Sequence, residues 1–181
     1  METYNIVKSI DRASLRVGAY VDLATGTKTS SDFTVMATIG ITPDQDVVII
    51  NVVRGRWEWP DARRVIIEET LRQQVPLLGI EATAFQMAAF QDLMRSGELG
   101  STAVRAVKPD KDKVTRSLPL LARAEAGKLY LVRAHWNRDL IAEFLAFPES
   151  THDDQVDAVS GALLLIGAAP KMRVVTVESS L

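Results

Sequence analysis

The chain has 181 residues and a formal net charge of −2, with 47% hydrophobic and 24% charged side chains. This length suggests one domain, and the composition excludes a disordered chain or a fibrous repeat. The absence of cysteine excludes a disulfide scaffold, a cysteine-ligated zinc site and a cysteine nucleophile. No run of about 18 apolar residues predicts a transmembrane helix, and the N-terminus lacks the apolar region of a signal peptide. We therefore expect a location inside a cell and no membrane partner.

Charge is unevenly distributed along the chain. Residues 101–138 carry nine basic and three acidic side chains, whereas residues 139–181 carry two basic and seven acidic ones. A basic segment beside an acidic one is compatible with binding of a polyanion around carboxylates that hold a metal. The other interpretation of the same basic run is a solvated helix with ordinary surface charges.

The predicted domain spans residues 15–169, after a leader or linker remnant at residues 1–14 and before a tail at residues 170–181. It opens with segments of alternating apolar or β-branched side chains, separated by turn residues, which predict strands in an antiparallel meander. The three predicted strands are Arg16–Leu23, Phe33–Ile41 and Val47–Arg54.

Helices and short strands then alternate along the chain. The predicted helices span about residues 59–74, 82–95, 112–126, 137–147 and 153–168, and the predicted strands span residues 77–81, 102–107 and 129–132. Pro60 fits a first helical turn, and the apolar run 77–80 is typical of a strand buried on both faces. Three antiparallel strands followed by α/β crossovers predict an α/β mixed sheet with helices on both faces, which is the element order of an RNase H-like fold.

Carboxylates stand at three places in otherwise apolar surroundings. Asp22 ends the first strand, Glu81 ends the buried strand, and Asp153, Asp154 and Asp157 lie in the first turn of the last helix. A carboxylate at the end of a buried strand is costly to desolvate unless it is paired or bound to a metal, and such strand ends form the usual ligand crevice of open α/β sheets. A strand-end turn or a helix cap is the structural alternative for each acid taken singly.

Taken together, the four carboxylates indicate a metal site more strongly than any one of them does. Asp154 and Asp157 are three residues apart, so both lie on one side of the predicted helix. Together with Asp22 and Glu81 they predict a pocket of oxygen ligands, which Mg²⁺ and Mn²⁺ prefer, and they would repel one another without a cation. Two such ions about 4 Å apart activate a water and stabilise the leaving oxygen of a phosphodiester.

Three acidic motifs resemble those of the nuclease domain of tailed-bacteriophage large terminases: Val21-Asp22, Gly79-Ile80-Glu81 and His152-Asp153-Asp154-Gln155-Val156-Asp157-Ala158. The segment 112–116, followed by Pro119-Leu120, resembles the basic helix of that family. The resemblance extends from about Val17 to Gly167, and its last motif is the most specific. Glu81 stands where many relatives have aspartate, and its longer side chain can shift one metal ion.

The resemblance implies a metal-dependent endonuclease domain that cuts concatemeric double-stranded DNA during genome packaging by two-metal hydrolysis, with Mg²⁺ or Mn²⁺. The implied catalytic metal ligands are Asp22, Glu81, Asp154 and Asp157. The implied residues next to these ligands are Asp153 and His152. Contacts with DNA phosphates are implied for Lys108, Lys111, Lys113 and Arg116.

The same resemblance implies a terminase ATPase domain, a small terminase and a portal as partners, in the cytoplasm of a host cell. A complete large terminase carries an ATPase motor, but the chain has no G-x-x-x-x-G-K-[ST] motif. Only Gly26-Thr27-Lys28-Thr29 is superficially similar, and it lacks a glycine directly before the lysine. We therefore expect the nuclease domain without the motor.

Other functions remain open. A junction resolvase or a transposase-like nuclease would use a similar acid set on the same fold. Residues 22–29 also fit a phosphate-binding hairpin of the actin or sugar-kinase type, but those folds need two domains and a longer chain. A non-catalytic DNA- or protein-binding module would require all four acids to be structural.

A basic and aromatic cluster follows the third predicted strand and consists of Arg54, Arg56, Trp57 and Trp59. Arginine and tryptophan are enriched at interfaces, which favours a contact with DNA or a partner. The alternative is a pair of tryptophans that covers the sheet edge, with arginine stems packed over it.

Overall fold

The structure is a computed structural model that describes residues 4–24, 33–81, 84–108, 110–149 and 153–168. The strands are β1 (Asn5–Val7), β2 (Arg16–Asp22), β3 (Thr34–Ile41), β4 (Val47–Gly55), β5 (Leu77–Glu81), β6 (Ala103–Val107) and β7 (Leu129–Val132). The α-helices are α1 (Trp59–Arg72), α2 (Ala84–Ser96), α3 (Lys113–Glu125), α4 (Asn137–Ala146) and α5 (Asp154–Ala168). Within the described residues, no helix is long and apolar enough to cross a membrane.

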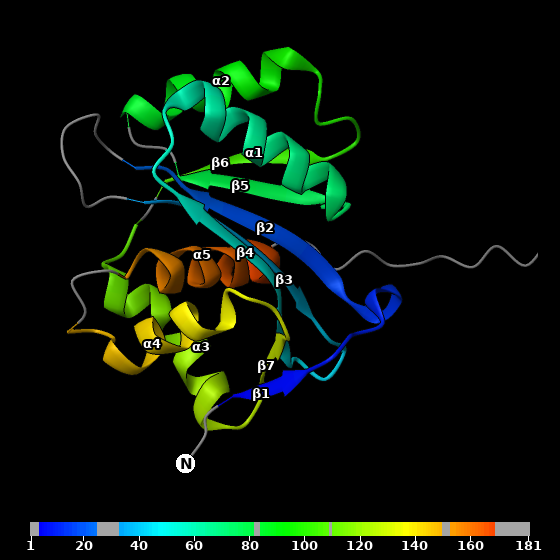
Figure 1. The fold of residues 1–181 in the computed structure, drawn as a ribbon, viewed down its shortest axis with the longest axis vertical. Coiled ribbons are helices and arrows are strands. Elements are labelled where there is room, and N and C mark those ends of the chain that lie inside the picture. Colours follow the sequence, from blue (N-terminus) through cyan, green and yellow to red (C-terminus); the bar gives the residue numbers. More distant parts are fainter. Residues whose placement is uncertain (1–3, 25–32, 82–83, 109, 150–152, 169–181) are drawn as a thin grey trace, which may run out of the picture.

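All the described strands form one mixed sheet in the order β1-β7-β4-β3-β2-β5-β6 (Figure 1). The predicted meander of β2, β3 and β4 is confirmed, because Asp22 pairs with Val35 at one end of β2 and Arg16 pairs with Ile41 at the other. β5 and β6 then add in parallel beside β2, and β7 adds in parallel beside β4. The carboxyl ends of β2, β4, β5 and β6 therefore meet at one edge of the sheet, which is called the carboxyl edge below.

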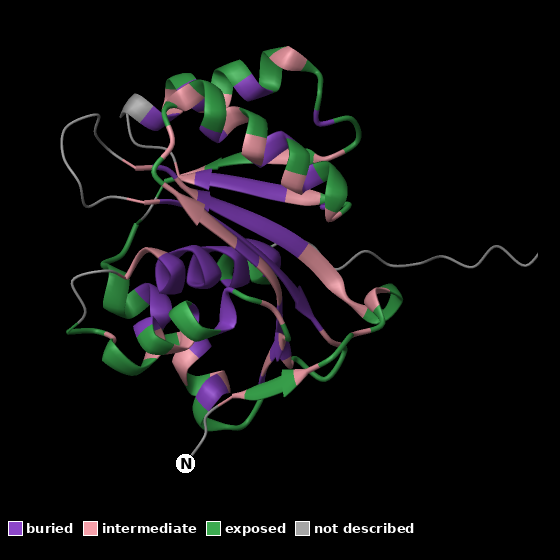
Figure 2. Ribbon diagram, viewed as in Figure 1, coloured by how far each residue is buried: buried purple, intermediate pink, exposed green. Residues whose placement is uncertain are grey.

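Helices cover both faces of the sheet, as predicted (Figure 1). Alternate residues of β2 point to opposite faces, so that Tyr20 packs in the core under α3, α4 and α5 while Ala19 and Val21 pack in the core under α1 and α2. The central strands are accordingly buried along most of their length (Figure 2). α5 is also buried over most of its surface, and it packs against β2 and β3. The RNase H-like α/β mixed sheet is thus confirmed.

The structure differs from the sequence prediction in the predicted leader, residues 1–14, and at the end of α1. Asn5–Val7, which falls inside the predicted leader, forms β1 and pairs in parallel with β7. Three residues are too few to show a strand pattern, and this strand exists only because β7 offers it a partner. α1 ends at Arg72 rather than near residue 74, because Gln74 adopts a positive φ of 47° that reverses the chain before β5.

Candidate functional site

The four predicted carboxylates come together at the carboxyl edge of the sheet. Asp22 and Glu81 are the last residues of β2 and β5, which are parallel neighbours with Val21 beside Ile80. α5 lies across β2 and begins at this edge, so its first turn brings Asp154 and Asp157 to the same place. The charges of Glu81, Asp157 and Asp154 all act on the carboxyl group of Asp22.

This convergence changes the acidity of Asp22. Burial raises the pKa of Asp22 to about 8, and the negative charges of Glu81, Asp157 and Asp154 act in the same direction. Burial also raises the pKa of Asp157, although Lys113 and Arg116 oppose that rise. The site therefore concentrates negative charge that needs either protons or cations.

Two cationic side chains of α3 partly neutralise the negative charge of these carboxylates. Lys113 Nζ lies 2.7 Å from Oδ1 of Asp153 and 3.0 Å from Oδ2 of Asp157. Arg116 bridges two acids, with its Nη1 3.3 Å from Oε2 of Glu81 and its Nη2 3.2 Å from Oδ1 of Asp157. The Arg116 side chain is 9% exposed and the Lys113 side chain 48%. Arg116 is thus held in place, whereas Lys113 can turn toward solvent.

The four lysines and arginines predicted to contact DNA therefore fall into two groups. Lys113 and Arg116 face the acids, and their pKa values show it: burial alone would lower both, but the carboxylates of the site raise them. Lys108 and Lys111 are exposed, and Lys108 directly follows β6 at the carboxyl edge. A contact with DNA stays a prediction for all four residues.

Glu143 on α4 holds the first turn of α5, and the sequence interpretation missed it. Its Oε1 accepts hydrogen bonds from the backbone N–H groups of Gln155 (2.6 Å) and Val156 (2.9 Å), and its Oε2 accepts one from Gln155 Nε2 (2.7 Å). Glu143 is buried, and burial raises its pKa although these hydrogen bonds lower it. A signal was present, because Glu143 follows the buried Leu140 by three residues and so lies on the same helix face.

Tyr20 is a second residue that the sequence interpretation missed. Its ring is buried beneath α5, and its hydroxyl group donates a hydrogen bond to Oε2 of Glu81 at 3.3 Å. Gly161 allows the Tyr20 ring to pack closely against α5, because a Cβ atom at this position would lie 2.7 Å from the ring. Burial and the charge of Glu81 raise the pKa of Tyr20, so its hydroxyl group stays protonated and acts as a donor.

The donor set fits a hard divalent cation in its chemistry. In the part of the chain that the structure describes, no three His, Asp or Glu side chains are arranged so that they could hold an ion as they stand, and Lys113 and Arg116 form ion pairs with Asp157. The donors are nevertheless all carboxylate oxygens, and Oδ2 of Asp157 is buried without an aligned hydrogen bond from the described residues. The predicted neighbour Asp153 pairs with Lys113, whereas His152 lies outside the described residues.

The charge on Asp22 should make the stability of the metal-free protein depend on pH. Asp22 ionises near its ordinary pKa of 3.8 in the unfolded chain but near 8 in the folded protein, so the folded state binds one more proton between these values. Its contribution to stability therefore falls as the pH rises through this window. In EDTA, we expect the midpoint of thermal unfolding to fall between about pH 5 and about pH 8, and to fall less in Asp22→Asn. Parallel curves for the two proteins would contradict the raised pKa.

A family model for the terminase RNaseH-like domain matches residues 19–165 of this chain. No curated protein matches the chain at a significant level. The large terminase nuclease of the thermophilic phage G20c, solved with bound zinc, superposes with a TM-score of 0.61 at 15% identity, over 83% of this chain and 81% of that one.

Two further solved structures are similar at lower TM-scores. The nuclease domain of the large terminase subunit of bacterial virus Sf6, solved with manganese and beta-thujaplicinol, has a TM-score of 0.55 at 8% identity, over 81% of this chain and 87% of that one. The Holliday junction resolvase of fowlpox virus has a TM-score of 0.52 at 11% identity, over 82% and 94%. These likenesses show the fold, and the family model, which covers most of the chain, shows the family. The chain belongs to the terminase RNaseH-like domain family.

Proposed function

We propose that this chain is the endonuclease domain of a phage large terminase, which hydrolyses phosphodiester bonds of concatemeric double-stranded DNA during genome packaging. The observation that carries the proposal is the convergence of Asp22, Glu81, Asp154 and Asp157 from two parallel strands and one helix. Membership of the terminase family supports the proposal.

The four carboxylates would hold two Mg²⁺ or Mn²⁺ ions. When bound, such ions supply activation of a water and stabilisation of the leaving oxygen. Divalent metals are present in the solved nucleases of phage G20c (zinc) and virus Sf6 (manganese), which supports a divalent cation here. Tyr20 orients Glu81 through its hydrogen bond, and Glu143 holds the turn that carries Asp154 and Asp157.

The cations of the site have separate tasks in this proposal. Arg116 is buried between Glu81 and Asp157 and keeps these two carboxylates in place. Lys113 is half-exposed beside its carboxylate partners Asp153 and Asp157, and from there it would contact a DNA phosphate. Lys108 and Lys111 are exposed and would position the DNA backbone without reading its sequence.

The proposal further includes the ATPase domain of a terminase, a small terminase and a portal as partners, in the cytoplasm of a host cell. Membership of the terminase family supports the terminase partners. A junction-resolving nuclease is the second candidate, because the fold is similar to that of the fowlpox virus resolvase. Faster cutting of a four-way junction than of a linear duplex of the same sequence would favour the second candidate.

Nicking of supercoiled plasmid tests the proposed activity. We expect the purified protein to nick the plasmid with Mn²⁺ or Mg²⁺ and not with EDTA. Calorimetric titration of Mn²⁺ into the protein separates a silent nuclease from a binding module, since only a nuclease site should bind the ion. No nicking together with no Mn²⁺ binding would contradict the proposal and leave a non-catalytic module.

A further inference from the structure

Two arginines and one phenylalanine form a cationic platform at the carboxyl edge of the sheet. This platform consists of Phe33, Arg54 and Arg56. The guanidinium carbons of Arg54 and Arg56 lie 4.8 Å and 4.3 Å from the centroid of the Phe33 ring. Cation–π contacts thus hold two positive charges at one aromatic ring.

The strand register places this platform next to the four carboxylates. Asp22 on β2 pairs with Val35 on β3, and Val35 pairs with Arg54 on β4. Residues directly opposite each other in antiparallel strands share a face, so Asp22 and Arg54 both project from the face that α5 covers. Two strand spacings separate them, which is about 10 Å.

The two arginines differ in their partners. Arg54 is 31% exposed and pairs with Asp139 of α4 at 2.9 Å and with Glu143 at 3.9 Å. Arg56 is exposed and makes no ion pair with any carboxylate of the described residues. Arg56 therefore presents an oriented positive charge to solvent, with no acidic partner from the part of the chain that is described.

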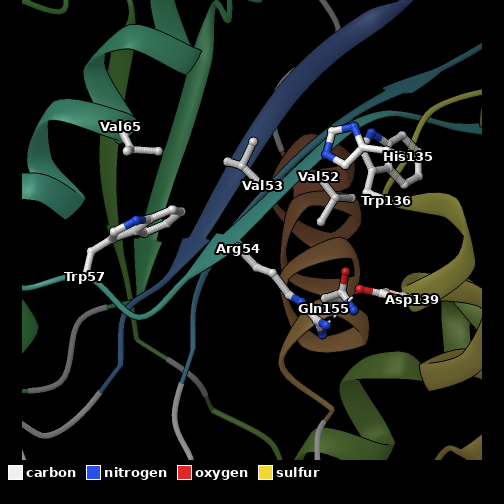
Figure 3. A pocket seen from close by; sticks show the side chains of 9 residues that line it. All are labelled: Val52, Val53, Arg54, Trp57, Val65, His135, Trp136, Asp139 and Gln155. Carbon is white, nitrogen blue, oxygen red and sulfur yellow. Dashed lines mark hydrogen bonds and ion pairs between the residues drawn. The ribbon is translucent and has the colours of Figure 1, made fainter.

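On the opposite face of β4, the indole ring of Trp57 packs against the end of the strand. A Cβ atom at Gly55 would overlap the indole of Trp57, so the glycine allows that ring to pack directly against the strand. Figure 3 shows that Trp57 lies beside Val65 of α1, whereas Arg54 points toward Asp139, and all four residues line a pocket of about 320 Å³. The basic and aromatic cluster predicted from sequence is thus divided, with its tryptophans on one face and its arginines on the other.

We propose that this platform binds the phosphodiester backbone of DNA on the β4 side of the carboxylates, an inference that rests on the proposed nuclease function. Four carboxylates repel a phosphate, so DNA that reaches them needs cations on either side. Lys108 and Lys111 supply these cations beyond β6, where Val107 pairs with Glu81. On the other side of the carboxylates, beyond β3, the platform supplies the cations.

The spacing suits a nucleic-acid strand. The roughly 10 Å between Asp22 and Arg54 lets both residues face the same DNA strand, whose phosphates advance by about 3.4 Å along the helix axis. Arginine suits this task because its planar guanidinium group stacks on an aromatic ring and still donates hydrogen bonds to phosphate oxygens. The platform therefore contacts the strand a few nucleotides from the bond that is cut.

DNA binding by Arg56→Ala tests this proposal. Fluorescence anisotropy with a labelled duplex, in EDTA and over a range of salt concentrations, gives the affinity and its salt dependence. We expect Arg56→Ala to weaken binding about fivefold to tenfold at about 0.1 M salt, and to reduce the slope of log K against log salt by about 0.9, the value for one lost phosphate contact. Arg56→Lys keeps the charge and should keep most of the slope.

Arg95→Ala is the matched control, because Arg95 is also exposed but lies in the last turn of α2 on the other side of the sheet. Equal affinity and slope for Arg56→Ala and Arg95→Ala would overturn the proposal. The measurement is independent of cleavage, since EDTA removes divalent metals. A protein that binds DNA through Arg56 but never cuts it would therefore refute the nuclease and not the platform.

Discussion

The Asp22→Asn variant should lose metal-dependent DNA cleavage while it keeps its fold. Mutation of residues that only support metal ligands already costs about 10- to 100-fold in metal affinity or activity, so loss of a ligand should cost more than about 100-fold. Asparagine has nearly the same shape as aspartate and removes a charge that burial and three neighbouring acids disfavour. We therefore expect the melting temperature of the variant in EDTA at about pH 8 to equal or exceed that of the native protein.

Plasmid nicking with Mn²⁺ and thermal unfolding, performed on the same preparations, measure these two effects. Asp46→Asn is a matched control, because Asp46 precedes β4 at the opposite edge of the sheet and pairs there with Lys128 at 3.6 Å. This control should cut DNA like the native protein. A fully active Asp22→Asn protein would refute the assignment of the metal site.

The Glu143→Ala variant should have the largest effect on stability. The substitution leaves the buried N–H groups of Gln155 and Val156 without their acceptor, and it removes a carboxylate partner of Arg54. Each unsatisfied buried donor costs about 1–3 kcal/mol, so we expect the free energy of unfolding to fall by about 3 kcal/mol or more. Urea unfolding measures this loss, and Glu143→Gln, which keeps one acceptor oxygen, should lose less.

Glu143 also acts on the site through α5, and metal binding should reveal this positioning role. In Glu143→Gln, which is expected to remain folded, we expect weaker Mn²⁺ binding by calorimetry, because the turn that carries Asp154 and Asp157 is held less firmly. Glu125→Ala is the control, since Glu125 is an exposed acid at the end of α3. Unchanged Mn²⁺ affinity in Glu143→Gln would limit Glu143 to a structural role.

The sequence predicted those parts of the fold and site that depend on local patterns. β2 to β5 could be located because their apolar and β-branched runs are long and are bounded by turn residues. Asp22 and Glu81 are recognisable from sequence because each one ends an otherwise apolar run. β1 was missed because three residues carry no pattern, and its pairing with β7 depends on the whole sheet.

The partners of the carboxylates could not be predicted from sequence. A basic helix segment shows that Lys113 and Arg116 are charged, but only the packing of α3 against α5 directs them to Asp157 rather than to solvent. Tyr20 lies within a strand of alternating side chains and carries no signal in the sequence that its hydroxyl group reaches Glu81. Side chains that act across two elements give no signal within either of them.

The order in which the four carboxylates occur along the chain has a consequence during protein synthesis. Asp22 and Glu81 leave the ribosome early, but Asp154 and Asp157 lie on α5, the last helix of the described chain. α5 is buried against β2 and β3, so the cluster of four acids is complete only when the final helix has docked on the finished sheet. A nascent or truncated chain without α5 would therefore lack two of the four carboxylates of the proposed metal site.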